Sequence, residues 1–169
     1  GKDIRASFRL ELINPIRTDT KVEIYREDAN ELAKKISADV AFIDPPYNSR
    51  QYSRFYHVLE TIARYDNPIL KGKTGLRDSD GQKSKYCSKR TLEKEFEDLI
   101  ANADFKYIFL SYNNEGLMNV ETIKSIMSTY GTYKCFTQSY KRFKADKDEN
   151  RRISGSETTE YLHCLIKGD

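Results

Sequence analysis

Four consecutive residues, Asp44-Pro45-Pro46-Tyr47, have the side chains in this sequence best suited to chemistry. A carboxylate and a proline carbonyl both accept hydrogen bonds, so Asp44 and Pro45 could together hold an amine that carries two N–H groups. The adjacent prolines stiffen the turn, which lets the carbonyl be aimed at a low entropic cost. Tyr47 offers a flat face on which an extruded base could stack. The four residues therefore suit the positioning of an exocyclic amine.

The tetrapeptide directly follows the apolar run 39–43, which is typical of a strand buried on both faces of a parallel sheet. Proline cannot continue a strand ladder, so this strand should end at Asp44. Open α/β sheets bind their ligands beyond the carboxyl ends of strands, which is where the tetrapeptide lies. An Asp-Pro pair also opens ordinary turns, so a strand stopped by a plain turn is the alternative interpretation.

The elements around this strand alternate between strand and helix patterns. Residues 21–25 alternate like a strand, and Asp28 with Glu31 forms a capping-box pattern at the start of a helix over 29–36. Apolar spacing predicts three more helices, over residues 55–65, 92–103 and 120–130, the last with Asn119 as its N-cap. Strand patterns recur over residues 107–111, 133–143 and 159–166.

This order predicts a single α/β domain over residues 1–169, with helices on both faces of a mostly parallel sheet. The last two strands are joined by the charged residues 144–157 without a helix, so the sheet should end in an antiparallel hairpin. Residues 67–90 form a long connection, and connections of this length are usually functional or disordered.

Composition narrows the class of protein. The chain has 169 residues, of which 38% are hydrophobic and 33% charged, as expected for one globular domain. It has no apolar run near the roughly 20 residues of a membrane span and no signal-peptide pattern, and a reducing, cytoplasmic location fits its cysteine content. Cys87, Cys135 and Cys164 are widely spaced, and His57 and His163 lie far apart, so we expect neither disulfides nor a metal site.

The net charge is only +3, but the basic residues are clustered. Residues 71–90 contain seven basic and two acidic residues, and residues 141–152 contain six basic and three acidic ones. Such clusters in connecting segments suit a polyphosphate partner, although an ordinary solvated loop is the alternative. Residues 50–56 mix base-reading, phosphate-binding and stacking side chains, which also suits a nucleic acid.

The tetrapeptide and its surroundings resemble the D12 class of adenine-N6 DNA methyltransferases of bacterial restriction–modification systems. The resemblance runs from about residue 21 to the end of the chain. Besides the tetrapeptide, it is carried by residues 48–60, by residues 111–116, and by the terminal hairpin with Tyr140, Arg142 and residues 160–162. Asp at the first position of the tetrapeptide favours adenine over cytosine as the target base.

The resemblance implies a Rossmann-like methyltransferase sheet, S-adenosylmethionine as the cofactor and double-stranded DNA as the substrate. Asp44 and Pro45 would accept hydrogen bonds from adenine N6, with Pro46 stiffening the turn and Tyr47 stacking on the flipped base. Asp28 and Asp44 fall where the family contacts its cofactor. Methyl transfer would be direct, without a covalent enzyme intermediate. The candidate DNA-contacting residues are Arg50, Gln51, Tyr52, Arg54, Lys83, Lys85, Lys89, Arg90 and Arg142.

The family's Phe-x-Gly-x-Gly cofactor motif has no counterpart here, because the eight glycines are scattered. In the family this motif and the target-recognition region precede the tetrapeptide, and only 43 residues precede Asp44. We therefore expect a C-terminal fragment whose partner is the missing N-terminal half or a partner subunit. The alternative is a non-catalytic DNA-binding or complementation fragment that is active only with a separate cofactor-binding half. Methylation of RNA or protein is a further alternative, which the match at residues 50–60 argues against.

Overall fold

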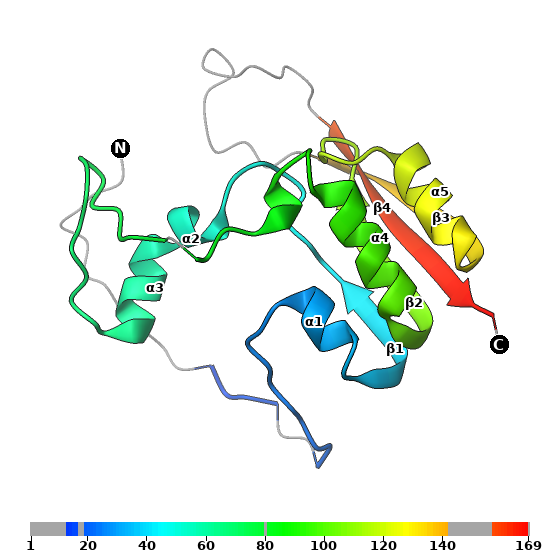
Figure 1. The fold of residues 1–169 in the computed structure, drawn as a ribbon, viewed down its shortest axis with the longest axis horizontal. Coiled ribbons are helices and arrows are strands. Elements are labelled where there is room, and N and C mark those ends of the chain that lie inside the picture. The colour runs from blue at the N-terminus through cyan, green and yellow to red at the C-terminus, as the bar shows by residue number, and fades with distance from the viewer. Residues whose placement is uncertain (1–12, 17–18, 80, 142–156, 169) are drawn as a thin grey trace.

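The computed structural model describes residues 13–16, 19–79, 81–141 and 157–168. Their helices and strands, drawn in Figure 1, follow one another along the chain. In order they are α1 (Ala29–Ala33), β1 (Ser37–Ile43), α2 (Tyr52–Phe55), α3 (His57–Arg64), the 3-10 helix η1 (Lys85–Cys87), α4 (Leu92–Asn102), β2 (Asp104–Asn113), α5 (Val120–Thr129), β3 (Gly131–Lys141) and β4 (Glu157–Lys167). The α/β class predicted from the sequence is confirmed.

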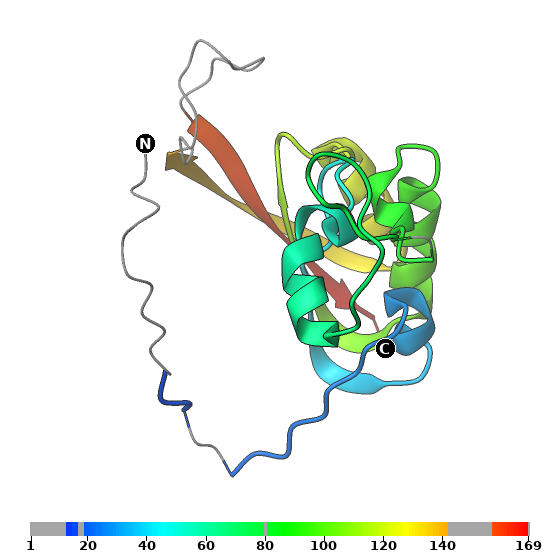
Figure 2. The same ribbon diagram turned by 90° about the vertical axis from the view of Figure 1, so that its left-hand side faces the viewer.

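The strands form one sheet in the order β1-β2-β4-β3. Strand β1 runs parallel to β2, whereas β4 is antiparallel to both β2 and β3. The predicted C-terminal antiparallel hairpin is therefore confirmed, and Figure 2 shows it extending away from the helices. The prediction of a mostly parallel sheet is wrong for the described part of the chain, where one of the three strand pairs is parallel.

Residues 21–25 explain part of that difference. They alternate as a strand should, but no strand is assigned to them, and Val22 and Ile24 are exposed. An alternating pattern becomes a strand only where a neighbouring strand supplies the hydrogen-bond ladder. This chain folds without such a neighbour for residues 21–25 among its described strands.

Helices α1, α4 and α5 cover one face of the sheet (Figure 1). Helix α4 buries four apolar side chains with helical spacing, Leu92, Phe96, Leu99 and Ile100, against the strands. On the other face, the side chains of Val40, Phe42 and Phe136 are 53%, 65% and 57% exposed. The second layer of helices that the sequence predicted is thus absent from the described residues.

The helix boundaries differ in detail from those predicted. Helix α1 ends at Ala33 rather than at residue 36, and the helix expected over 55–65 is broken at Tyr56 into α2 and α3. The Asn119 cap is confirmed, because its Oδ1 accepts a hydrogen bond from the Thr122 N–H at 2.7 Å. No helix in the described ranges is both long and apolar enough to cross a membrane.

Candidate active site at the end of strand β1

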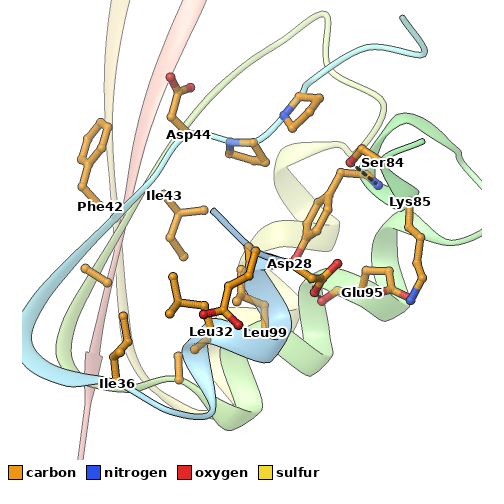
Figure 3. Close-up of a pocket in the computed structure, with 18 of the residues that line it drawn as sticks. Asp28, Leu32, Ile36, Phe42, Ile43, Asp44, Ser84, Lys85, Glu95 and Leu99 are labelled. Atoms are coloured by element: carbon orange, nitrogen blue, oxygen red, sulfur yellow. Dashed lines mark hydrogen bonds and ion pairs between the residues drawn. The ribbon is translucent and has the colours of Figure 1, made fainter. Parts of the chain in front are cut away.

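A cavity of about 710 Å³ opens at the carboxyl end of β1 (Figure 3). Its walls come from α1, β1, α4 and residues 81–86. Asp28, Asp44, Pro45 and Pro46 all line this cavity, so the structure brings together residues that the sequence predicted for the cofactor and for the target amine. A volume of this size suits a small organic ligand.

The cavity combines an apolar floor with acidic side chains. Leu32, Ile43 and Leu99 supply apolar surface between α1, β1 and α4. Figure 3 shows the Asp44 carboxylate pointing away from the apolar floor, and this side chain is exposed. Among the described residues, none donates a hydrogen bond to the Asp44 carboxylate or to the Pro45 carbonyl. Both acceptors are therefore available to a ligand.

Asp28 has a structural task as well as a place in the cavity. Its Oδ1 accepts hydrogen bonds from the backbone N–H groups of Asn30 and Glu31, at 3.0 and 3.3 Å, which caps α1 as predicted. No described residue hydrogen-bonds Oδ2 of Asp28. One carboxylate oxygen thus fixes the helix while the other remains for a ligand.

The tetrapeptide is anchored from behind by the turn that follows β2. The Leu117 N–H donates to the Tyr47 carbonyl at 2.9 Å, so the backbone of Tyr47 is fixed while its side chain is 39% exposed. In that turn Gly116 lies against the Tyr112 ring, where a Cβ atom would come within 2.0 Å of the ring. Gly116 is therefore required for this close packing, and the packing in turn positions Leu117.

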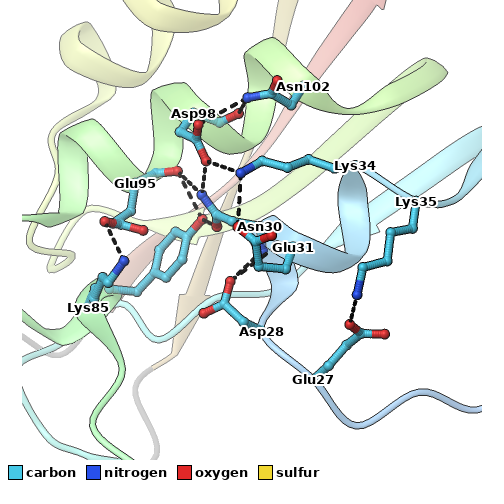
Figure 4. A network of polar contacts seen from close by, with 11 residues as sticks. Glu27, Asp28, Asn30, Glu31, Lys34, Lys35, Lys85, Glu95, Asp98 and Asn102 are labelled. Atoms are coloured by element: carbon cyan, nitrogen blue, oxygen red, sulfur yellow. Dashed lines mark hydrogen bonds and ion pairs between the residues drawn. The ribbon is translucent and has the colours of Figure 1, made fainter.

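A buried polar network joins α1, η1 and α4 beside the cavity (Figure 4). The Asn30 amide donates to the Glu95 carbonyl at 2.9 Å and to the Asp98 carboxylate at 2.8 Å, and it accepts from the Tyr86 hydroxyl at 2.7 Å. Burial, followed by the nearby carboxylates of Glu95 and Asp28, raises the pKa of Tyr86, so this hydroxyl stays protonated and able to donate. The network holds in place two of the cavity walls.

This network could not be predicted from the sequence. Asn30 is the one residue that indicates the network, because it places a polar side chain on the side of α1 that faces α4. A buried amide at such a position requires hydrogen-bond partners. Tyr86 and Cys87 gave no such signal within their polar segment, yet both are buried.

The predicted DNA-contacting residues differ in their exposure and contacts. Gln51 and Lys85 have internal partners, because the Gln51 amide bonds the Ser84 backbone and Lys85 Nζ lies 3.0 Å from a Glu95 carboxylate oxygen. Exposed members of the set are Arg50, Tyr52, Arg54, Lys83, Lys85, Lys89 and Arg90, and Lys83 and Lys85 also line the cavity. Arg142 lies outside the described residues.

Two of the exposed residues are held by aromatic contacts near the tetrapeptide. The Arg50 guanidinium lies 5.1 Å from the centroid of the Phe55 ring, and the Tyr52 and Tyr56 rings meet edge to face at 5.6 Å. Burial, with smaller contributions from Tyr47 and Asp44, raises the pKa of Tyr52.

Arg77, part of the basic cluster 71–90, is an internal residue rather than a surface cation. Its guanidinium is buried and donates to both carboxylate oxygens of Asp66, at 3.2 and 2.6 Å, and to the Thr61 hydroxyl at 3.3 Å. This pair lowers the pKa of Asp66 and ties the long connection to α3. Together with buried Tyr86 and Cys87, it anchors the long connection over residues 67–90 to the rest of the chain.

Neither a metal cluster nor a disulfide is found where the chain is described. No group of three His, Cys, Asp or Glu side chains there is arranged to hold a metal ion. Cys87, Cys135 and Cys164 are all unpaired, and Cys87 Sγ donates weakly to the Arg50 carbonyl at 3.4 Å.

Comparison with known proteins adds to this geometry. The family model of D12 class N6 adenine-specific DNA methyltransferases matches residues 2–126. The type II methyltransferase M.NlaIII of Neisseria lactamica is 53% identical over 145 residues, which cover 86% of this chain and 43% of the relative. M.FokI of Planomicrobium okeanokoites is 43% identical over 146 residues, covering 85% of this chain and 22% of that protein.

The viral type II methyltransferase M.CviAII, from Paramecium bursaria Chlorella virus 1, is 35% identical over 147 residues, covering 86% of this chain and 42% of the relative. The chain thus spans less than half the length of each of these three relatives. No solved structure gives a significant match to the chain.

Proposed function

This chain belongs to the D12 class of N6 adenine-specific DNA methyltransferases, and from that premise we propose that its strand-end tetrapeptide presents an adenine of double-stranded DNA for methylation. S-Adenosylmethionine, when bound, supplies the methyl group. The observation that carries the proposal is the single cavity that Asp28 and Asp44 share at the end of β1. The whole reaction belongs to a longer enzyme, of which this chain is the catalytic part.

The chain's own residues hold the target amine. The Asp44 carboxylate and the Pro45 carbonyl accept hydrogen bonds from the two N–H groups of adenine N6. This leaves the nitrogen lone pair free to attack the methyl group. Both acceptors are without a described partner, so they are available for this task. Tyr47 stacks on the flipped base, which suits its partly exposed ring and fixed backbone.

The cofactor fits the rest of the cavity. Its apolar floor, formed by Leu32, Ile43 and Leu99, suits the adenosine rings, and the free oxygen of Asp28 suits a hydroxyl or amine of the adenosine. A further part of the proposal is that cationic side chains contact DNA phosphates. It is supported by the exposure of four of them, Arg50, Arg54, Lys89 and Arg90.

The test is methyl transfer by the complete enzyme. Incubation with labelled S-adenosylmethionine and duplex DNA should yield N6-methyladenine, detected by mass spectrometry of the digested DNA. Methylation of cytosine, RNA or protein by the complete enzyme would overturn the assignment.

A second candidate function follows from the short coverage of the relatives. The chain lacks a glycine-rich cofactor motif and matches less than half of M.NlaIII, which favours a fragment that acts only when joined to a separate cofactor-binding half. Calorimetry separates the two: under this second function the chain alone binds S-adenosylmethionine weakly or not at all. A micromolar or tighter dissociation constant for the chain alone would exclude it.

A further inference from the structure

The hairpin of β3 and β4 continues beyond the end of β2. Strand β2 ends at Asn113, opposite Glu160, whereas β3 and β4 pair for three further rungs, up to Lys141 and Glu157. Figure 2 shows the hairpin extending away from the helices. The basic cluster 141–152, with six basic and three acidic residues, begins at the end of β3. A two-stranded hairpin is marginally stable on its own, so the contacts at the base of this extension decide how it is held.

Asn114 holds the base of the extension with its side chain. Its backbone N–H donates to the Thr159 carbonyl at 3.1 Å, and the Thr159 N–H donates to Asn114 Oδ1 at 3.2 Å. In an antiparallel ladder, the backbone carbonyl of the opposite residue would accept this second hydrogen bond. The amide oxygen of Asn114 takes the place of that carbonyl. Strand β4 therefore gains one more rung, while the backbone after Asn114 turns away from the sheet.

The turn that begins at Asn114 leads directly to the tetrapeptide. Leu117 lies three residues further along the chain, and its N–H donates to the Tyr47 carbonyl at 2.9 Å. The end of the turn is fixed from below, because the buried Tyr112 hydroxyl accepts a hydrogen bond from the Met118 N–H at 3.3 Å. One short, hydrogen-bonded turn thus connects the base of the hairpin to the backbone of Tyr47.

We infer that Asn114 is a positioning residue for methyl transfer, which ties the hairpin of β3 and β4 to the backbone of Tyr47. The hairpin sequence includes a basic cluster suited to DNA, and Tyr47 is the proposed stacking surface for the flipped adenine. Through Asn114, the DNA at the hairpin and the base at the tetrapeptide keep one relative placement. The inference rests on the proposed function, because it assigns a further residue to the placement of the same adenine.

Single-turnover kinetics of the complete enzyme on duplex DNA test the inference. Asn114→Ala removes the acceptor for the Thr159 N–H, and the variant should fold because Asn114 is exposed. We expect the rate of methyl transfer at saturating DNA to fall about tenfold, because small displacements from the reacting geometry cost this much or more. The dissociation constant for S-adenosylmethionine should stay within about twofold, since Asn114 is not among the residues that line the cavity.

Two further variants separate positioning from a general loss of stability. Asn114→Asp keeps an oxygen that can accept from Thr159, so it should restore the rate to within about threefold of the native value. Asn102→Ala is the matched control: this exposed asparagine also bonds a backbone group, the Asp98 carbonyl at 2.8 Å, but it lies in the last turn of α4. Its rate should stay within about twofold of native.

Three kinetic outcomes would overturn the inference. They are a native rate in Asn114→Ala, an equal loss of rate in Asn102→Ala, and a rate in Asn114→Asp that is as low as that of Asn114→Ala.

Hydrogen exchange in the complete enzyme gives a measurement that does not depend on the reaction. The Leu117 amide bonds the Tyr47 carbonyl, so its exchange rate measures how firmly the turn holds the tetrapeptide. Asn114→Ala should speed this exchange at least about threefold, and Asn102→Ala should leave it unchanged. Unchanged exchange in Asn114→Ala would overturn the inference. If the native enzyme forms no N6-methyladenine while Leu117 responds as expected, the proposed function fails and the link between the hairpin and Tyr47 is supported.

Discussion

Gln51 and Ser84 are joined by two hydrogen bonds: the Gln51 Oε1 atom accepts from the Ser84 N–H at 2.7 Å, and Gln51 Nε2 donates to the Ser84 carbonyl at 3.0 Å. Ser84 belongs to the cavity wall formed by residues 81–86, and Gln51 lies four residues after Tyr47. The pair therefore fixes one wall of the cavity to the chain that follows the tetrapeptide.

Removing this pair should loosen the cofactor site. Each hydrogen bond contributes about 1 kcal/mol net, so Gln51→Ala should weaken cofactor binding by the complete enzyme roughly tenfold. Gln51→Glu keeps the oxygen that accepts from the Ser84 N–H, so its affinity for the cofactor should lie between those of the native enzyme and of Gln51→Ala. Isothermal titration calorimetry measures the effect. If Gln51→Ala weakens binding to DNA but not to cofactor, the sequence hypothesis of a DNA contact is preferred.

Asp44 should be essential for methyl transfer but not for cofactor affinity. In the complete enzyme, Asp44→Ala removes an acceptor that no described residue uses, so we expect activity to fall at least a thousandfold. Cofactor binding should change by less than threefold, since the apolar floor and Asp28 remain. Single-turnover kinetics with separate calorimetry checks both. Near-normal turnover in the variant would remove Asp44 from the catalytic assignment.

Much of this site could be predicted from the sequence, because its signals are local. Asp28 as a cap, Asp44-Pro45 as the end of a strand and Asn119 as a cap each depend on a few neighbouring residues. The strand pairing of the sheet could be predicted less well, because the alternation at residues 21–25 cannot reveal whether a neighbouring strand exists. The pairing of Gln51 with Ser84 could not be predicted either, because it joins residues that lie 33 positions apart in the sequence.

Tyr47 should act through its ring face. Its backbone carbonyl, not its side chain, makes the bond to Leu117, so Tyr47→Ala should melt within a few degrees of the native protein. Loss of stacking in Tyr47→Ala should raise the activation free energy by about 1–3 kcal/mol, whereas Tyr47→Phe should keep most of the activity. A mismatched target adenine should partly rescue Tyr47→Ala, because that base costs less to extrude. Absence of rescue with a large fall in melting temperature would indicate a packing role instead.

The basic residues of segment 71–90 should separate into two functional groups. Neutralising exposed Lys89 and Arg90 should flatten the salt dependence of DNA binding, by about 0.9 in the logarithmic slope per lost phosphate contact. Arg77→Ala should instead lower the melting temperature, because it leaves the Asp66 carboxylate and Thr61 without their buried partner. Filter binding between 50 and 200 mM salt and thermal unfolding measure the two effects. An unchanged slope for Lys89→Ala with Arg90→Ala would show that these side chains face away from DNA.

His163 should make the stability of the chain depend on pH in a defined window. Its side chain is fully buried on β4, Nδ1 lies 2.7 Å from the Tyr133 hydroxyl, and Nε2 has no hydrogen-bond partner among the described residues. Burial lowers the pKa of His163 to about 4, whereas a histidine in the unfolded chain titrates near 6.5. Between these two values the unfolded chain binds a proton that the folded chain excludes.

The contribution of His163 to the free energy of unfolding is therefore fully present above pH 6.5. It is lost as the pH drops toward 4, at about 1.4 kcal/mol per pH unit and by about 3 kcal/mol in total. The carboxyls of Glu60 and Asp66, whose pKa values are lowered by Arg64 and Arg77, lose their own contribution at the acidic end of the same range. His163→Gln isolates the histidine, since it does not titrate and its amide oxygen can accept from Tyr133. Urea unfolding at pH 7.5, 6.0 and 5.0 should show a steep fall for the native chain and a shallow one for the variant. Parallel curves for the two proteins would mean that the pKa of His163 is not lowered in the folded chain.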